Sequence, residues 1–102
     1  EPILTCGGLQ LNLLEHRGVV EGREVKLTPT EYELLKVMLK YAGRVLTHKQ
    51  LLKAVWGNEY DTDTHYIRIY MRQLRRKIEP DPAQPKYLIT EAGIGYRLLG
   101  GE

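Results

Sequence analysis

The feature that most constrains the fold is a change of hydrophobic period at residue 28. Before it, Leu9, Leu11 and Leu13 are separated by single polar residues, which is the period of a half-buried strand. After it, apolar residues recur every three or four positions, as in a helix with one buried face. Glycines interrupt residues 3–27 where turns are needed. The sequence therefore predicts a small antiparallel sheet of three or four strands, followed by helices.

A capping signal marks the start of the first helix. Thr28 is followed by Pro29 and, at the third helical position, by Glu31. The Thr hydroxyl and the Glu carboxylate can each accept a hydrogen bond from the other's backbone N–H, and proline gives up a donor that has no partner there. We expect Gly43 to end this helix. The side chains expected to face the core are Leu34, Leu35, Met38, Leu39 and Ala42.

A second capping box opens a shorter helix. Thr47 is followed three positions later by Gln50, and Gly57 is expected to end the segment. Residues 58–63 are polar and acidic, and they make a longer connection than the turn of a minimal helix-turn-helix. The stripe expected to be buried consists of Leu51, Leu52, Val55 and Trp56.

The third helix carries the clearest functional signal. We expect it over about residues 64–79, because Pro80 cannot continue it, and residues 65–78 hold four Arg and one Lys with no acidic residue. At about 100° per residue, four apolar side chains fall on one stripe that should face the core. They are Ile67, Met71, Leu74 and Ile78. The opposite side then carries His65, Ile69, Arg72, Gln73 and Arg76, with Tyr66 at one edge.

This outward face suits the major groove of duplex DNA. The groove admits one α-helix, Arg and Gln make paired contacts with guanine and adenine edges, and Ile69 fits a thymine methyl group. Arg68 and Arg75 flank the core stripe, where they could reach phosphates, which set orientation rather than sequence. Most basic helix faces are only solvated, but this one has no acidic residue to pair with its arginines. Arg75 has a second interpretation, as an ion-pair partner of Glu31 or Glu33.

Composition limits the other function classes. A length of 102 residues predicts one domain spanning residues 1–102. Cys6 is the only cysteine, so an internal disulfide is impossible and a reducing, cytoplasmic location is expected. No apolar run is long enough to cross a membrane. The histidines lack metal-ligand spacing, and Gly93 and Gly95 lack the third glycine and the helix of a dinucleotide-binding loop. We therefore expect no metal, no cofactor and no enzymatic activity.

Four motifs, in order along nearly the whole chain, resemble the effector domains of OmpR/PhoB-type response regulators. Residues 65–71 and 90–97 are most similar, within that family, to regulators of potassium-transport operons. The resemblance implies an α+β winged helix-turn-helix with an N-terminal four-stranded antiparallel sheet, three helices and a C-terminal β-hairpin, the wing, which the alternation in residues 86–99 also indicates. The motifs are LTPTEYELL (27–35), VLTHKQLL followed by VWG (45–57), LRRKI (74–78) and GIGYR (93–97).

The resemblance also implies a function and partners. Members bind double-stranded DNA sequence-specifically and control transcription in two-component systems. The chain begins at Glu1 rather than Met, and the family implies a missing N-terminal receiver domain that a sensor kinase phosphorylates. Phosphorylated receivers pair, so that two copies bind neighbouring direct-repeat half-sites. The loop between the second and third helices touches RNA polymerase, and its residues here are Asn58, Glu59, Tyr60 and Asp61.

Individual DNA contacts carry over from the resemblance as well. Arg72 and Gln73 correspond to groove contacts of relatives, and Trp56 is open to a second interpretation as a purely packing residue. Ala92 departs from several relatives, which insert an arginine there into the minor groove. The rival function is a winged-helix module that docks on a protein, whereas RNA binding is disfavoured because the major groove of A-form RNA does not admit a helix. The residues expected to contact phosphates are His48, Trp56, Arg68, Arg75 and Thr90.

Overall fold

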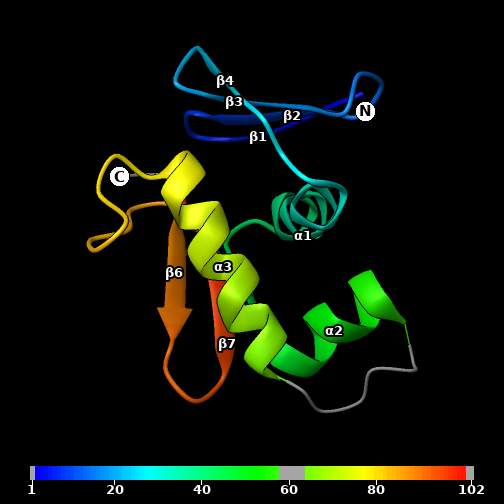
Figure 1. Ribbon diagram of the computed structural model, residues 1–102, viewed down its shortest axis with the longest axis vertical. Helices are drawn as coiled ribbons and strands as arrows, with labels where there is room; N and C mark the ends of the chain where they lie inside the picture. Colours follow the sequence, from blue (N-terminus) through cyan, green and yellow to red (C-terminus); the bar gives the residue numbers. More distant parts are fainter. Residues whose placement is uncertain (1, 58–63, 101–102) are drawn as a thin grey trace.

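The computed structural model describes residues 2–57 and 64–100. In this part of the chain four strands are followed by a helix, a strand, two helices and two strands, which confirms the predicted α+β fold. The first four strands form one antiparallel sheet in chain order, at one end of the molecule (Figure 1). Leu9 pairs with Val20, and both side chains are buried, so the alternation places one face of the sheet on the core. The strands are β1 (Ile3–Cys6), β2 (Leu9–Asn12), β3 (Arg17–Val20) and β4 (Arg23–Val25).

The first helix, α1 (Pro29–Lys40), begins with the expected capping box. Thr28 Oγ1 accepts from the Glu31 N–H at 3.2 Å, and Glu31 Oε1 accepts from the Thr28 N–H at 2.9 Å. The helix ends three residues before Gly43, because the Ala42 N–H turns back to the Leu39 carbonyl in a tight final turn. Ala42 is consequently exposed, and the expectation that it faces the core was wrong.

A short strand that the sequence did not predict, β5 (Val45–Thr47), leads directly into α2 (His48–Trp56). The second capping box is present, with Thr47 and Gln50 exchanging hydrogen bonds of 2.8 and 3.0 Å. Of the stripe expected to be buried, Leu51 and Leu52 are buried, whereas Val55 and Trp56 are only partly covered.

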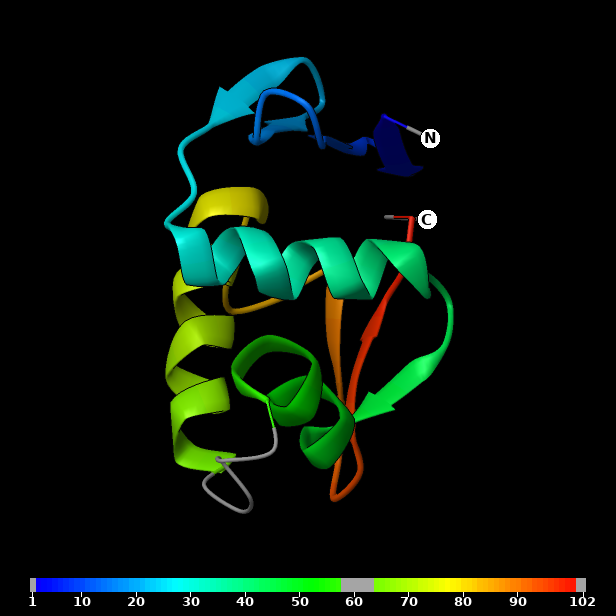
Figure 2. The same ribbon diagram turned by 90° about the vertical axis from the view of Figure 1, so that its right-hand side faces the viewer.

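The wing is confirmed as β6 (Leu88–Glu91) and β7 (Gly95–Leu98), and β5 adds to it as a third strand. Leu46 pairs with Tyr96, so the segment that starts α2 is part of the same sheet as the wing. Figure 2 shows β5 running alongside this hairpin. The hairpin turn lies at the end of the molecule opposite the N-terminal sheet (Figures 1 and 2).

The third helix, α3 (Thr64–Ile78), stops one residue before the predicted end. Glu79 still donates its backbone N–H to the Arg75 carbonyl at 2.9 Å, and Pro80 follows it and cannot continue the helix. The Glu79 side chain is buried, and its carboxylate accepts hydrogen bonds of 2.8–3.2 Å from the backbone N–H groups of Lys86, Tyr87 and Leu88. Glu79 thereby ties the end of α3 to the start of β6. The predicted core stripe is confirmed, since each of its four side chains is at most 1% exposed. No helix of residues 2–57 and 64–100 is long and apolar enough to cross a membrane.

Candidate nucleic-acid interface

The outward side chains of α3 form one exposed surface. The six residues predicted to meet base edges are all exposed, and two of them are apolar or aromatic: Ile69 is 40% and Tyr66 is 47% exposed. Burying such side chains against a partner would be favourable, since each removes apolar surface from water. The six residues are His65, Tyr66, Ile69, Arg72, Gln73 and Arg76.

A groove of about 490 Å³ separates α3 from the wing. Among the described residues that line it, Glu91 alone is acidic, and it is held by Arg97, whose Nε lies 2.9 Å from the Glu91 carboxylate. Four arginines of α3 therefore dominate the charge of the groove, which suits a polyanion. The lining residues are His48, Arg68, Arg72, Arg75, Arg76, Pro82, Thr90, Glu91, Ala92, Gly93 and Tyr96.

The pairing of Glu91 with Arg97 was missed from the sequence, although a signal for it exists. Glu91 pairs with Gly95 across the hairpin, so Arg97, two residues further along β7, is its diagonal neighbour on the same face.

Burial raises the pKa of the nearby Tyr96 hydroxyl, although Arg75 and Arg68 act in the opposite direction. Tyr96 is therefore neutral at physiological pH and takes no charge away from the groove.

The two flanks of α3 meet different neighbours. Arg68 and Arg75 line the groove beside the wing, whereas Tyr70 and Lys77 lie on the other flank, toward α2 and α1. The Lys77 ammonium is 2.5 Å from Oε1 of Glu31, whose side chain is 1% exposed.

The interpretation of Arg75 as a partner of Glu31 or Glu33 was wrong. Glu31 pairs with Lys77, as above, and Glu33 pairs with Lys36 at 3.2 Å. The Arg75 guanidinium instead binds the wing: Nε and Nη2 donate to the Leu88 carbonyl at 3.0 and 2.8 Å, and Nη2 donates to Thr90 Oγ1 at 2.7 Å.

The remaining predicted phosphate contacts come from α2 and the wing. His48 packs edge-on against Tyr96, with ring centroids 5.5 Å apart, and lines the groove. Trp56 lies at the other end of α2 and packs against the Tyr70 ring at the same centroid distance. Thr90 is exposed on β6. The loop expected to touch polymerase, Asn58, Glu59, Tyr60 and Asp61, lies outside the described residues.

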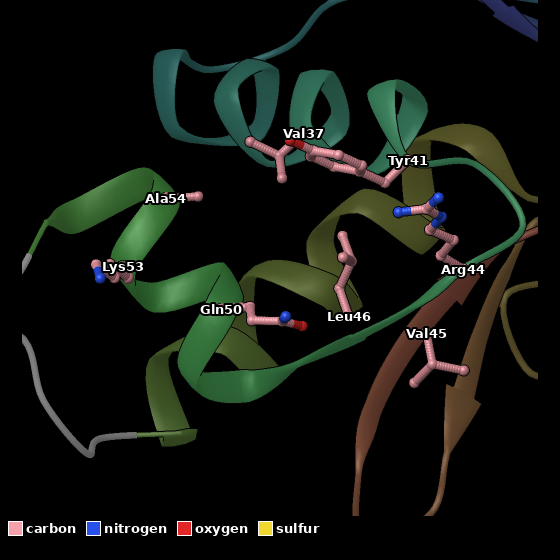
Figure 3. A pocket seen from close by; sticks show the side chains of 8 residues that line it. All are labelled: Val37, Tyr41, Arg44, Val45, Leu46, Gln50, Lys53 and Ala54. Atoms are coloured by element: carbon pink, nitrogen blue, oxygen red, sulfur yellow. The ribbon is translucent and has the colours of Figure 1, made fainter.

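A second hollow, of about 560 Å³, lies between α1, β5 and α2. Figure 3 shows Val37 and Tyr41 on one side of it, Gln50 and Ala54 of α2 on the other, and Leu46 behind them. None of its eight lining residues is acidic, and they contain no acid–base pair that could support catalysis. Among the described residues, no three His, Cys, Asp or Glu side chains gather where they could hold a metal ion. The basic groove beside α3 is therefore the candidate functional site.

Comparison with known sequences gives consistent matches. Residues 22–98 match the family model described as transcriptional regulatory protein, C terminal. The chain is 43% identical over 97 residues to the transcriptional regulatory protein KdpE of Mycobacterium tuberculosis strain H37Rv, covering 95% of this chain and 43% of that protein. It is 55% identical over 84 residues to the KDP operon transcriptional regulatory protein KdpE of Escherichia coli K12, covering 82% of this chain and 36% of that protein. The chain thus spans less than half the length of these relatives.

Solved structures share the fold. The response regulator DrrB, a Thermotoga maritima OmpR/PhoB homologue, superposes with a TM-score of 0.87 and 27% identity, covering 98% of this chain and 45% of that one. The RstA DNA-binding domain of Klebsiella pneumoniae, crystallised with the RstA box, superposes with a TM-score of 0.88 at 20% identity, covering 98% and 99% of the two chains.

Proposed function

This chain belongs to the family of C-terminal domains of OmpR/PhoB-type transcriptional regulatory proteins, and on that premise we propose that it binds double-stranded DNA sequence-specifically to control transcription. The observation that carries the proposal is the basic groove, in which four arginines of one helix line a hollow beside a hairpin whose turn is exposed. The RstA domain, which has the same fold, was crystallised with a DNA element.

In this proposal α3 enters the major groove and the wing lies along the backbone. The outward face of α3 meets base edges through the six residues described above. His48 and Arg68 line the groove and Thr90 stands exposed at its edge, which suits phosphate contacts; Trp56 is a further candidate, from the end of α2. Ala92 is too short to reach into the minor groove, so base preference comes from α3.

For the protein that contains this domain, we propose a cytoplasmic two-component regulator. A receiver domain phosphorylated by a sensor kinase would pair two copies on direct-repeat half-sites, and Asn58, Glu59, Tyr60 and Asp61 would contact RNA polymerase. The similarity to two regulators called KdpE, one of them a KDP operon regulator, supports control of a potassium-transport operon. Residues 1–102 would constitute its single DNA-binding domain.

Selection against randomised duplex DNA tests the function directly. We expect one half-site to be enriched, with an affinity that falls steeply as salt rises from about 50 to 200 mM, because each neutralised phosphate releases counterions. Binding without enrichment of any sequence would show that α3 is a basic helix that binds DNA nonspecifically. If no duplex binds at low salt, the proposal fails, and a protein-docking role for the winged fold takes its place.

A further inference from the structure

We propose that Arg75 is a positioning residue, which clamps the wing to α3 and presents Thr90 to a DNA phosphate, instead of binding DNA itself. This inference rests on the proposed function, since it concerns how the groove is held for a nucleic-acid backbone. It differs from the assignment that family resemblance gives to Arg75, which is a phosphate contact. Three observations carry it.

The first observation is that the Arg75 guanidinium donates hydrogen bonds to two residues of β6. Nε and Nη2 both reach the carbonyl oxygen of Leu88, a residue that is fully buried, and Nη2 also reaches Thr90 Oγ1. The planar guanidinium presents its donors in a fixed arrangement, so these bonds fix both the position and the rotation of β6 relative to α3. Two of the three nitrogens of Arg75 are thereby used inside the protein.

The second observation concerns the Thr90 hydroxyl. A threonine hydroxyl has one hydrogen to donate and lone pairs to accept with. Since Oγ1 accepts from Arg75 at 2.7 Å, its hydrogen remains available to a group outside the protein, and Thr90 is exposed at the groove. A phosphate oxygen is an acceptor and fits that donor. The positive charge of Arg75 behind the hydroxyl strengthens such a bond, as charge-assisted hydrogen bonds are the stronger ones.

The third observation is the contact with the other strand of the wing. The Arg75 guanidinium lies 5.8 Å from the ring centroid of Tyr96 on β7, within the range of a cation–π interaction. Arg75 therefore contacts both wing strands. Arg68, on the same flank of α3, is exposed and lines the groove, where its charge can meet a phosphate.

Binding measurements on matched variants separate positioning from direct contact. Losing one direct phosphate contact reduces the slope of log affinity against log salt by about 0.9. Lysine keeps the charge but cannot make the paired hydrogen bonds. On the enriched half-site duplex we therefore expect Arg75→Lys to bind about tenfold more weakly with the parent's salt slope, and Arg75→Ala, which also removes a charge close to the phosphate, to bind more weakly still. Arg68→Ala, the control for a direct contact, should reduce the slope.

Thr90→Val tests whether Arg75 acts through Thr90. We expect Thr90→Val to weaken binding in the parent and to have no further effect in the Arg75→Ala background, since residues that share one interaction are not additive. Additive losses, or parent-like affinity in Arg75→Lys together with a reduced slope in Arg75→Ala, would overturn the inference in favour of a direct contact.

Backbone amide NMR of the DNA-free protein gives a readout that does not depend on DNA. We expect both Arg75 variants to shift the amide resonances of residues 88–91 and 96 while the rest of the spectrum stays folded, and Arg68→Ala to leave those resonances in place. If the parent selects no DNA, the proposed function fails but these spectra still test the clamp. Unshifted wing resonances in Arg75→Ala show that there is no clamp.

Discussion

Arg72 and Gln73 are adjacent on the exposed face of α3, and they differ in the base edge each can recognise. Arg pairs with guanine and Gln with adenine in the major groove. We expect Arg72→Ala and Gln73→Ala each to cost about 1–3 kcal/mol on the enriched site and to relax the base preference at one position. Titration and a repeated selection measure both effects. Gln84→Ala, in the exposed loop after α3, is the control and should bind like the parent; equally tight binding by the two α3 variants would refute the groove assignment.

Lys77 has a structural role that its place in a basic cluster conceals. Its ammonium binds the buried Glu31 carboxylate that also caps α1. We expect Lys77→Met to lower the free energy of unfolding by about 2 kcal/mol, because a hydrogen bond to a charged group contributes roughly 1.5–3 kcal/mol and its loss leaves a buried charge unpaired.

The control for Lys77 is Glu31→Gln, which keeps the capping box but removes the charge. In that background Lys77→Met should cost much less, as urea unfolding of the four proteins would measure. A Lys77→Met protein as stable as the parent would show that the pair contributes nothing to folding.

The sequence predicted which side chains of α3 are buried, but it did not predict which neighbours its two flanks contact. The helical period separates buried from exposed side chains, and the core stripe from Ile67 to Ile78 is confirmed. The period cannot tell which neighbour each flank meets, because that depends on how the helix packs. This is why Arg75, and not Lys77, was considered as a basic partner of Glu31.

At the scale of elements, local sequence signals predicted where the helices begin. Both capping boxes begin helices where expected, because capping is decided within four residues. Strand β5 was missed because its three residues show no alternation, and they are extended only through pairing with β7, half the chain away. The end of α3 was predicted to within one residue, because Pro80 marks it locally. A long-range contact accounts for the missed strand.

The close pairing of β5 with β7 depends on a residue without a side chain. A Cβ atom at Gly95 would lie 1.9 Å from the Leu46 carbonyl oxygen, and a backbone atom cannot move aside as a side chain can. We expect Gly95→Ala to destabilise the domain by about 3 kcal/mol or more and to weaken DNA binding, measured by thermal unfolding and titration.

Gly93→Ala, in the same hairpin, is the matched comparison for Gly95→Ala. Gly93 has open space around it but a φ of +75°, so alanine there costs only the left-handed backbone strain of about 1–2 kcal/mol. If both variants lost the same free energy of unfolding, the clash at Gly95 would be relieved by separating β5 from β7 at no cost in stability.

At the scale of the whole molecule, Tyr87 joins the N-terminal sheet to the C-terminal segment. Its hydroxyl donates to Glu21, at the turn between β3 and β4, and Lys86 pairs with the same carboxylate at 3.1 Å. Burial, and then the hydrogen bond with Glu21, raise the pKa of Tyr87 from 10.0 to about 12. Neutral Tyr87 therefore contributes stability that is complete below pH 10 and is lost as the pH rises toward 12.

We expect alkaline destabilisation to depend on that link. Between pH 10 and about 12 the free energy of unfolding should fall more steeply in the parent than in Tyr87→Phe. The other six tyrosines are the same in both proteins, so the difference between the two curves isolates Tyr87. Urea unfolding at a series of pH values measures it, and parallel curves would contradict the expectation.

The pairing of Val45 with Arg97 has a consequence for how the domain folds. Closing so long a loop costs chain entropy before any contact compensates for it, so such pairings form late. The turns of α1, α2 and α3 and the β6–β7 hairpin can form between segments that are close in the sequence, and Arg75 reaches β6 only 13 residues along the chain. During folding the groove between α3 and the wing can therefore assemble first, and the pairing of β5 with β7 then joins the start of α2 to it.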